Sequence, residues 1–267
     1  MSGADPAAPL RMEPPVPPSP LRAERLLAIE ASGRACSVAV WADGAVAAQA
    51  REEMLRGQSE RLAPMIAEVM AASGLAFASL QAVAVTLGPG GFTGVRIGLA
   101  AAEGVALAWR LPILGIGGFE LLAAALPPEA RGGRALLAAI DAKRPEVYVA
   151  AWDAAGGKLL EPQLAAPAAL ADSLAQASPG PLLLAGDGAP QLLPALVAAG
   201  LSAEDSGIAA LEAPLLARLA AARPLPADRR PPQPLYLRPP DTTRPKPRPA
   251  TGAGTGTGRR RGRGDAG

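Results

Sequence analysis

The chain has 267 residues, of which 49% are hydrophobic and 3% aromatic, and its formal net charge is +2 at pH 7. It contains one cysteine and no histidine, which excludes an internal disulfide framework, a His-rich or Cys-rich zinc site and a Ser-His-Asp triad. Any chemistry would rest on Asp, Glu, Lys, Ser or Thr, and we expect no metal and no cofactor.

The N-terminal stretch, residues 1–24, is rich in proline and is expected to be disordered. It lacks the continuous apolar core of a secretory signal. No run of about 18 apolar residues is free of charges and helix breakers, so no segment is expected to span a membrane. The sequence therefore predicts a cytoplasmic protein without membrane contact.

Two similar stretches mark the first and the second half of the chain. "LLAIEASGRACSVAVW" starts at Leu26 and "LAAIDAKRPEVYVAAW" starts at Leu137, so that the acids Glu30 and Asp141 coincide. Each copy has an apolar run, an acid, a short polar turn and a second apolar run, which is typical of a β-hairpin that opens a domain. Chance similarity in a chain rich in Ala and Val is the alternative, and we adopt internal duplication as the hypothesis.

The elements after each hairpin support two similar halves. In the first half we expect a third strand near 45–50, a helix that carries Leu62, Met65, Ile66, Val69 and Met70 at helical spacing, a strand at 82–86 and a helix at 94–109. In the second half we expect a helix near 168–176, the strand "PLLLAG", a "GDG" turn and a helix at 190–199. Residues 25–111 and 112–240 are therefore interpreted as two β-β-β-α-β-α halves. This is a duplicated α/β fold of the actin-like (ASKHA, ribonuclease H-like) type, whose last helix can return to the first half.

The C-terminal stretch, residues 241–267, is rich in Pro and Gly, is basic, and is expected to be disordered. Its last 24 residues hold seven Lys or Arg and one Asp, a net charge of +6 that leaves −4 on the rest of the chain. This tail is either a solubilising extension or a weak contact for nucleic acid.

A glycine-rich turn, "TLGPGGFTGVRIGL", joins the strand at 82–86 to the next helix. Gly88, Gly90 and Gly91 admit positive φ, and Thr93 is the expected N-cap. Exposed N–H groups at a helix start can hold an anion, yet the spacing fits neither GxGxxG nor GxxxxGK[ST]. From the residues alone, a structural turn and a phosphate site both stay open.

Several segments together resemble the TsaB (YeaZ) family. They are "LLAIEASGRACSVAVW", "GQSERLAPMIAEVM", "GPGGFTGVRIGLAAAEGVALAW", "LAAIDAKRPEVYVAAW" and "LYLRPPD", in family order from Leu26 to Asp241. The resemblance implies an actin-like fold and a non-catalytic dimerization subunit of the bacterial machinery that makes threonylcarbamoyladenosine in tRNA. It implies a heterodimer with the catalytic TsaD paralogue, a further TsaE-type ATPase partner, and tRNA reached through the complex. A homodimer of the isolated chain stays open.

The chain departs from the family and from its catalytic paralogue at several positions. Where the paralogue has metal-binding histidines, this chain has "LPILGIGGFELLAAAL", which offers no set of metal ligands. Glu30 stands where the family generally has Asp, Gln58 replaces a frequent His, and Gly91 replaces a frequent Ser. Each change argues against direct catalysis or nucleotide binding, whereas Pro145 in place of a common Gly leaves the fold unaffected.

The family interface is a four-helix cluster, which here would involve helices 59–70 and 94–109. Gly94, Gly98 and Ala102 recur every four residues and form a flat stripe, which packs either on its own sheet or against another helix. We carry the interface role onto nine residues: Leu62, Met65, Ile66, Val69, Gly94, Val95, Gly98, Leu99 and Ala102.

A vestigial nucleotide site is the remaining candidate. It comprises Glu30, Gly88, Gly90, Gly91 and Asp141. The two acids either coordinate a magnesium-bound nucleotide or accept hydrogen bonds from turn amides, and we favour the turn. The alternative function is a cleft nucleotide hydrolase or transferase that uses these two acids. A glycoprotease-like hydrolase is disfavoured because histidine and a metal cluster are lacking. Asp187 is either a turn residue, which we favour, or a remnant of an adenosine-binding loop. We interpret Arg96 as a solvated or interface charge rather than an anion clamp, and Cys36 as a small buried apolar residue.

Overall fold

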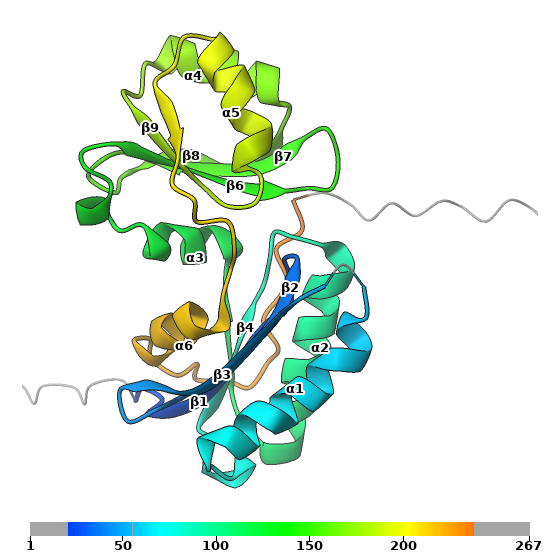
Figure 1. Cartoon of the computed structure of the whole chain (residues 1–267). Coiled ribbons are helices and arrows are strands. Elements are labelled where there is room, and N and C mark those ends of the chain that lie inside the picture. The colour runs from blue at the N-terminus through cyan, green and yellow to red at the C-terminus, as the bar shows by residue number, and fades with distance from the viewer. Residues whose placement is uncertain (1–20, 55, 238–267) are drawn as a thin grey trace, which may run out of the picture.

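A computed structural model describes residues 21–54 and 56–237 of the chain (Figure 1). The disorder expected for residues 1–20 and 241–267 concerns parts outside the described residues. The expected N-terminal boundary at residue 24 is wrong, because Ala23 is buried against the first sheet and Arg22 forms a β-bridge with Pro224. The folded body therefore includes residues from 21 onward.

The first half is a mixed five-stranded sheet with the order β3-β2-β1-β4-β5. Strand β1 pairs antiparallel with β2 and parallel with β4, so it lies at the centre and is buried on both faces. Strand β3 alternates between exposed and half-buried residues, as an edge strand does. The strands are β1 (Arg25–Glu30), β2 (Ala35–Ala42), β3 (Ala45–Glu53), β4 (Ala82–Thr86) and β5 (Ile113–Ile116).

The second half repeats this topology in a sheet with the order β8-β7-β6-β9-β10. Its hairpin of β6 and β7 ends at the pair Asp141–Val147, just as the pairing of β1 and β2 ends at Glu30–Ser37. The duplicated actin-like architecture expected from the sequence repeat is thus confirmed. The strands are β6 (Ala135–Asp141), β7 (Val147–Trp152), β8 (Lys158–Ala165), β9 (Leu182–Ala185) and β10 (Ala203–Asp205).

Each half contains one strand more than the sequence pattern predicted. Strand β5 pairs with β4, so the first sheet extends to Ile116 and not to the expected boundary at residue 111. Strand β10 likewise adds to β9. Both strands were missed because they have only four and three residues, too few to establish an alternating pattern.

Helices cover both faces of both sheets (Figure 1). Helices α1 and α2 pack on one face of the first sheet, and α4 and α5 pack on the outer face of the second. Helices α3 and α6 lie between the two sheets, with α6 against the first and α3 against the second. The helices are α1 (Gln58–Ser73), α2 (Phe92–Trp109), α3 (Gly118–Ala125), α4 (Pro167–Ala177), α5 (Ala189–Ala198) and α6 (Ala213–Ala221), with short 3-10 turns η1 (Phe77–Ser79) and η2 (Pro128–Ala130).

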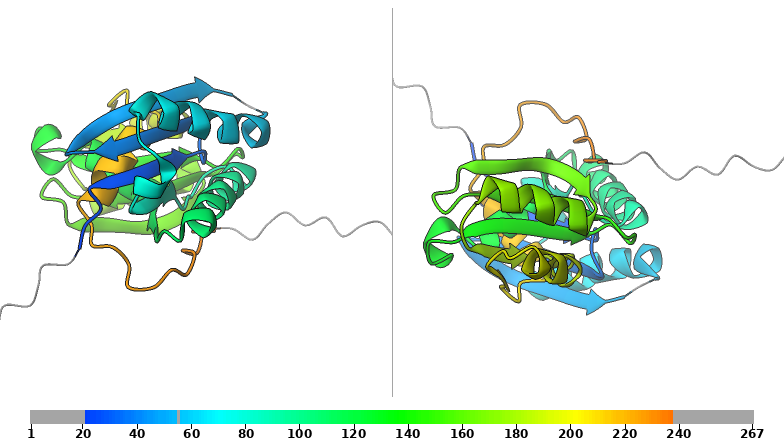
Figure 2. Two further views of the ribbon diagram at one scale, coloured as in Figure 1. Left: turned by 90° about the horizontal axis from the view of Figure 1, so that it is seen from below. Right: turned by 90° about the horizontal axis from the view of Figure 1, so that it is seen from above.

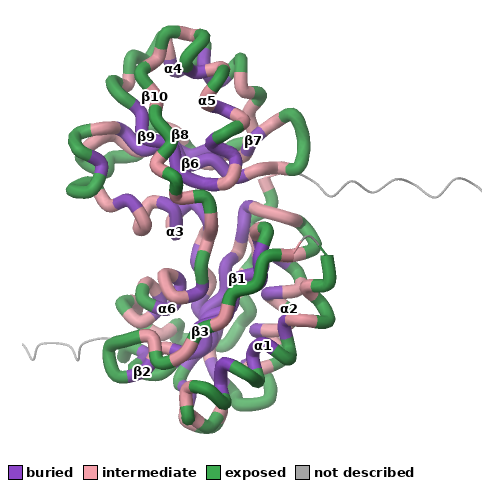
Figure 3. Tube along the Cα trace, in the orientation of Figure 1, coloured by how far each residue is buried: buried purple, intermediate pink, exposed green. Residues whose placement is uncertain are grey.

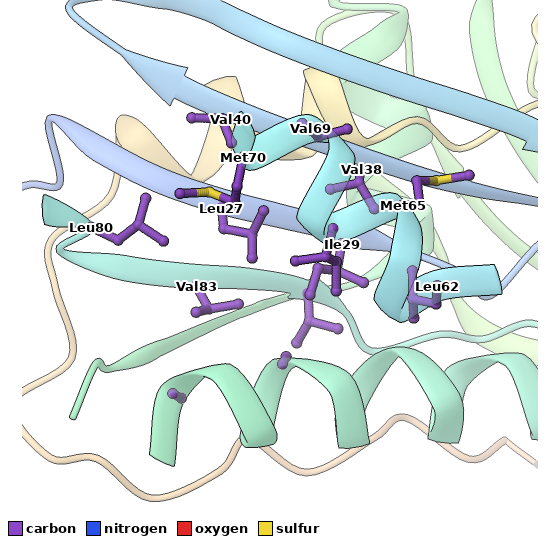
Figure 4. Packing of buried hydrophobic residues seen from close by; sticks show 14 of the residues in the cluster. Leu27, Ile29, Val38, Val40, Leu62, Met65, Val69, Met70, Leu80 and Val83 are labelled. Atoms are coloured by element: carbon purple, nitrogen blue, oxygen red, sulfur yellow. The ribbon is translucent and has the colours of Figure 1, made fainter. Parts of the chain in front are cut away.

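The core of the first half forms where α1 meets the central strands (Figure 4). The apolar residues that recur at helical spacing in α1 are all buried and face side chains of β1 and β2. Their burial removes apolar surface from water, which holds this amphipathic helix on the sheet. No helix among the described residues is both long and apolar enough to cross a lipid bilayer.

A C-terminal strap, residues 222–237, returns from α6 along the first half (orange in Figure 2). Pro232 lies beside Gly115 of β5, where an added Cβ would come within 2.8 Å of the proline ring. Further on, the amide of Leu235 donates a hydrogen bond of 2.8 Å to the carbonyl of Leu87. The strap therefore ends beside the glycine-rich turn, next to the site described below.

Candidate functional site

The glycine-rich turn packs directly on the end of the first strand. The amide of Gly91 donates a hydrogen bond of 2.8 Å to the carbonyl of Ser32. A Cβ added at Gly90 would lie 2.5 Å from that carbonyl oxygen, and one added at Gly94 would overlap the carbonyl oxygen of Ala31. Backbone of the β1–β2 turn thus packs directly against Gly90 and Gly94, and the glycines permit this close approach.

The start of α2 differs from the expectation. The helix begins at Phe92 with Gly91 as its N-cap, and no side chain caps it, so the expected N-cap at Thr93 is wrong. Within the turn, Gly88 has φ of +85°, which favours glycine. The first-turn N–H groups of α2 consequently have no capping side chain.

Glu30 is a buried turn residue. Its Oε1 accepts hydrogen bonds from the Ser32 amide (2.6 Å), the Ser32 hydroxyl (2.7 Å) and the Gly33 amide (3.2 Å). Its Oε2 and the hydroxyl of Thr86 are buried and have no hydrogen-bond partner among the described residues. Burial raises the pKa of the Glu30 carboxyl, and the nearby hydroxyls and amides oppose that rise. The carboxyl group therefore stabilises its own turn, the arrangement favoured from the sequence.

This raised pKa gives the stability a defined pH dependence. Between the ordinary pKa of 4.5 and the folded value, the folded state binds more protons at Glu30 than the unfolded chain does. The free energy of unfolding contributed by this group is therefore fully present below pH 4.5 and falls as the pH rises toward the folded pKa. We expect Glu30→Gln to remove this fall, because the amide keeps the acceptor for the turn and gives Thr86 a donor.

The measurement is urea denaturation of wild type and Glu30→Gln from about pH 4.5 to 8, followed by circular dichroism. As the pH rises, the free energy of unfolding of wild type should fall relative to that of Glu30→Gln. Parallel curves over this range would contradict the assignment.

Asp141 and Asp187 both pair with the ammonium group of Lys143. The ammonium of Lys143 lies 2.7 Å from Asp141 Oδ2 and 3.5 Å from Asp187 Oδ2. Asp141 Oδ1 accepts the Lys143 amide (2.6 Å), and Asp187 Oδ1 accepts the Asp141 amide (2.8 Å). Among the described residues, no hydrogen bond or ion pair joins Glu30 to Asp141. The place that a divalent cation would take between two carboxylates is thus occupied by Lys143, which the sequence analysis missed.

The cleft between the halves is narrow beside these turns. A pocket of about 120 Å³ lies between the β1–β2 turn and the second half, and Leu122, Ile140 and Leu211 form its apolar wall. Small-molecule sites usually have several hundred Å³, so this pocket is small for a nucleoside triphosphate. Within the described ranges, no group of three or more Cys, Asp or Glu could hold a metal ion. This geometry offers no support for a cleft hydrolase that uses Glu30 and Asp141.

Most of the residues expected at the partner interface are buried in the monomer's own core. A Cβ added at Gly98 would lie 3.6 Å from Ala31 Cβ and 3.7 Å from Val85 Cγ2, so the stripe of small residues faces its own sheet. Apolar residues at helical spacing indicate the helix face that packs on the core, and here that face packs on the sheet of the same chain. Gly94 and Leu99 are half-buried. Seven of the nine residues expected at the interface are buried within the monomer: Leu62, Met65, Ile66, Val69, Val95, Gly98 and Ala102.

A second stripe of small residues on α2 points to solvent. Ala100, Gly104 and Ala108 are exposed, a Cβ added at Gly104 would meet nothing within 4 Å, and the neighbouring Leu107 is 83% exposed. Figure 3 shows exposed segments along the outer sides of α1 and α2. We define the docking face by seven of the exposed apolar residues of these two helices: Ala63, Ala67, Ala71, Ala100, Gly104, Leu107 and Ala108. Sequence reasoning chose the other stripe because both have the same four-residue spacing.

An aromatic cluster fixes the strap to the start of α2. The Nε of Arg96 donates a hydrogen bond of 3.1 Å to the hydroxyl of Tyr236, and its guanidinium lies 3.7 Å from the centroid of the Phe92 ring. The rings of Phe92 and Tyr236 are 5.3 Å apart. Arg96 is thus held against two rings.

Cys36 is buried, and burial raises the pKa of its thiol to about 11, so it is an unreactive core residue.

Comparisons with known proteins identify the family. Residues 51–202, more than half of the chain, match the family model described as tRNA N6-adenosine threonylcarbamoyltransferase (TsaD). The tRNA threonylcarbamoyladenosine biosynthesis protein TsaB of Escherichia coli is 41% identical over 128 residues, which are 48% of this chain and 54% of that protein. TsaB of Haemophilus influenzae is 40% identical over 123 residues, 46% of this chain and 51% of that protein. The chain spans about half the length of the curated relatives it matches.

A solved structure agrees with these relatives. The crystal structure of a Pseudomonas aeruginosa protein with similarity to peptidase YeaZ superposes with a TM-score of 0.65 and 26% identity, over 80% of this chain and all of that one. The duplicated fold, the matched family model and the TsaB relatives support the same family assignment. The chain belongs to the family of that threonylcarbamoyltransferase model and, within it, to the TsaB (YeaZ) group.

Proposed function

We propose that this chain is a non-catalytic subunit of the machinery that transfers threonylcarbamoyl to adenosine in tRNA. The observation that carries the proposal is the docking face, two parallel rows of small exposed residues on α1 and α2 with Leu107 projecting from them. Small side chains let helices approach closely, so the face suits a partner that presents two helices of its own. The catalytic paralogue, which has the same fold, is such a partner.

The residues at the cleft favour a scaffold role over an enzymatic one. The family model describes a transferase, but this chain has no histidine, and Asp141 and Asp187 are both paired with Lys143. Chemistry at the threonylcarbamoyl group would therefore be performed by the partner, and this chain would bind and position it. In this proposal the complex also recruits a TsaE-type ATPase and brings tRNA to this chain.

The test is Leu107→Asp in the full chain, measured by isothermal titration with the purified catalytic paralogue. Burying a carboxylate at the centre of an apolar interface typically costs a hot-spot energy of about 2 kcal/mol or more, which corresponds to at least about thirtyfold weaker binding. The fold should not change, because the side chain is 83% exposed in the monomer.

The matched control is Val197→Asp, which places the same charge on α5 of the second half. Val197 is also an exposed apolar helix residue, at 57% exposure. It should bind the paralogue as wild type does. If Leu107→Asp folds normally and retains full affinity, the docking face is not the interface.

A further inference from the structure

A basic pocket lies at the ends of α1 and α2 nearest the cleft. Its volume is about 540 Å³, and it opens where the first residues of both helices meet the β1–β2 turn. Among the described residues that line it are three basic side chains, Arg34, Arg56 and Lys143, and no carboxylate. This lining contrasts with the body of the protein, which carries −4 once residues 244–267 are set aside.

Two of these cations are free to bind a ligand. Arg34 and Arg56 are exposed, and within residues 21–54 and 56–237 neither side chain has a hydrogen bond or ion pair. Arg61, a half-buried arginine of the same region, is in contrast paired with Glu52 and Glu68. Unpaired cations at a concave surface concentrate positive potential, so the pocket attracts anions.

The backbone adds to this charge. The N-caps of α1 and α2 are Gly57 and Gly91, and neither helix has a capping side chain. Both helices thus present uncapped first-turn N–H groups and the positive end of the helix dipole to a pocket that the arginines already make basic. The arginines supply the full charges, and the helix ends reinforce them.

The composition of the pocket favours a nucleic acid. Arg guanidinium groups bind phosphate oxygens in pairs, and the lining also contains Phe92, whose ring is 36% exposed beside Arg96. Exposed aromatic rings interleaved with cations are the usual surface for single-stranded RNA. We propose that this pocket binds a backbone phosphate of RNA through Arg34 and Arg56. The choice of RNA rests on the proposed function in tRNA modification.

The test measures the binding of a fluorescently labelled RNA stem-loop to the full chain by anisotropy at several salt concentrations. The double variant Arg34→Ala/Arg56→Ala is compared with Arg25→Ala/Arg110→Ala. The control removes the same charge at the opposite ends of β1 and α2 and leaves the basic tail in place. Because each phosphate contact contributes about 0.7 to 0.9 to the magnitude of the slope of log K against log[salt], loss of this one contact in the pocket variant should reduce that magnitude by about 0.7 to 0.9.

We expect the control double variant to change the slope by less than half as much. Equal losses in the two double variants would overturn the proposal, because they would show that RNA responds to overall charge. Saturable binding of ATP that the pocket variant abolishes, with RNA binding unchanged, would also overturn it and identify a nucleotide as the ligand.

A second measurement separates this inference from the proposed function. The pocket variant should bind the catalytic paralogue with wild-type affinity, since its two arginines lie outside the docking face. If it loses the paralogue and keeps RNA, the pocket is part of a protein interface and the inference fails. Failure of the proposed function would appear in Leu107→Asp and its control, whichever result the RNA titration gives.

Discussion

Gly94→Ala should destabilise the protein strongly, and Gly104→Ala on the same helix should stabilise it. A Cβ at Gly94 would overlap the carbonyl oxygen of Ala31, so α2 would have to move away from the first sheet. Overpacking typically costs about 1 to 3 kcal/mol, and overlap with backbone places this variant at or above the upper limit. At Gly104 the added methyl group meets nothing within 4 Å, and alanine in a helix interior gains about 0.5 to 1 kcal/mol over glycine.

Urea denaturation of both variants, followed by circular dichroism, checks the pair. The midpoint should shift in opposite directions, although the chemical change is the same single methyl group. If Gly94→Ala were as stable as wild type, the small-residue stripe would not face the sheet, and the original assignment of Gly94, Gly98 and Ala102 to the partner interface would be restored.

Gly186→Ala is expected to have an effect of similar size in the second half. Gly186 has φ of +109°, and an added Cβ would overlap the carbonyl oxygen of Ala139 and come within 2.9 Å of Leu122 Cδ1. Two separate penalties therefore apply, the backbone strain of a side chain at positive φ and the clash with β6. We expect a loss of about 3 kcal/mol or more, which is a large fraction of the stability of an ordinary domain.

Gly180→Ala is the matched control for this prediction. Gly180 also has positive φ, at +79°, but an added Cβ meets nothing within 4 Å. The free energy of unfolding of Gly180→Ala should fall only by the backbone strain, about 1 to 2 kcal/mol. Thermal unfolding of the two variants side by side gives the contribution of the clash, and equal melting temperatures would show that close packing of the "GDG" turn on β6 is unimportant.

The sequence predicted those features of the fold that repeat. The hairpins that start at Leu26 and Leu137 occupy equivalent places in two sheets of the same strand order, and α1 buries the residues that recur at helical spacing. Strands β5 and β10 were missed because they are short. The N-terminal boundary was misplaced because Ala23 is buried by α6, a segment about 190 residues away that no local pattern reveals.

The site was predicted less well because it depends on which surface each side chain meets. Glu30 accepts hydrogen bonds from amides of its own turn, which is the arrangement that the sequence analysis favoured because no Walker-type lysine or metal cluster accompanies the acid. Lys143 could have been found by its place two residues after Asp141. The two stripes on α2 could not be distinguished, because Gly98 and Gly104 differ only in whether the sheet lies beside them.

The crossed placement of α3 and α6 affects how the two halves can move. Helix α3 follows the last strand of the first sheet yet packs on the second, and α6 follows the second sheet yet packs on the first. An ion pair between Glu120 and Arg223 joins α3 to the end of α6. Each sheet is thus covered by a helix that follows the other sheet in the chain, so hinge opening would separate α3 from α6 and break the contact between them. This contact and the Glu120–Arg223 ion pair therefore favour the closed arrangement of the two halves.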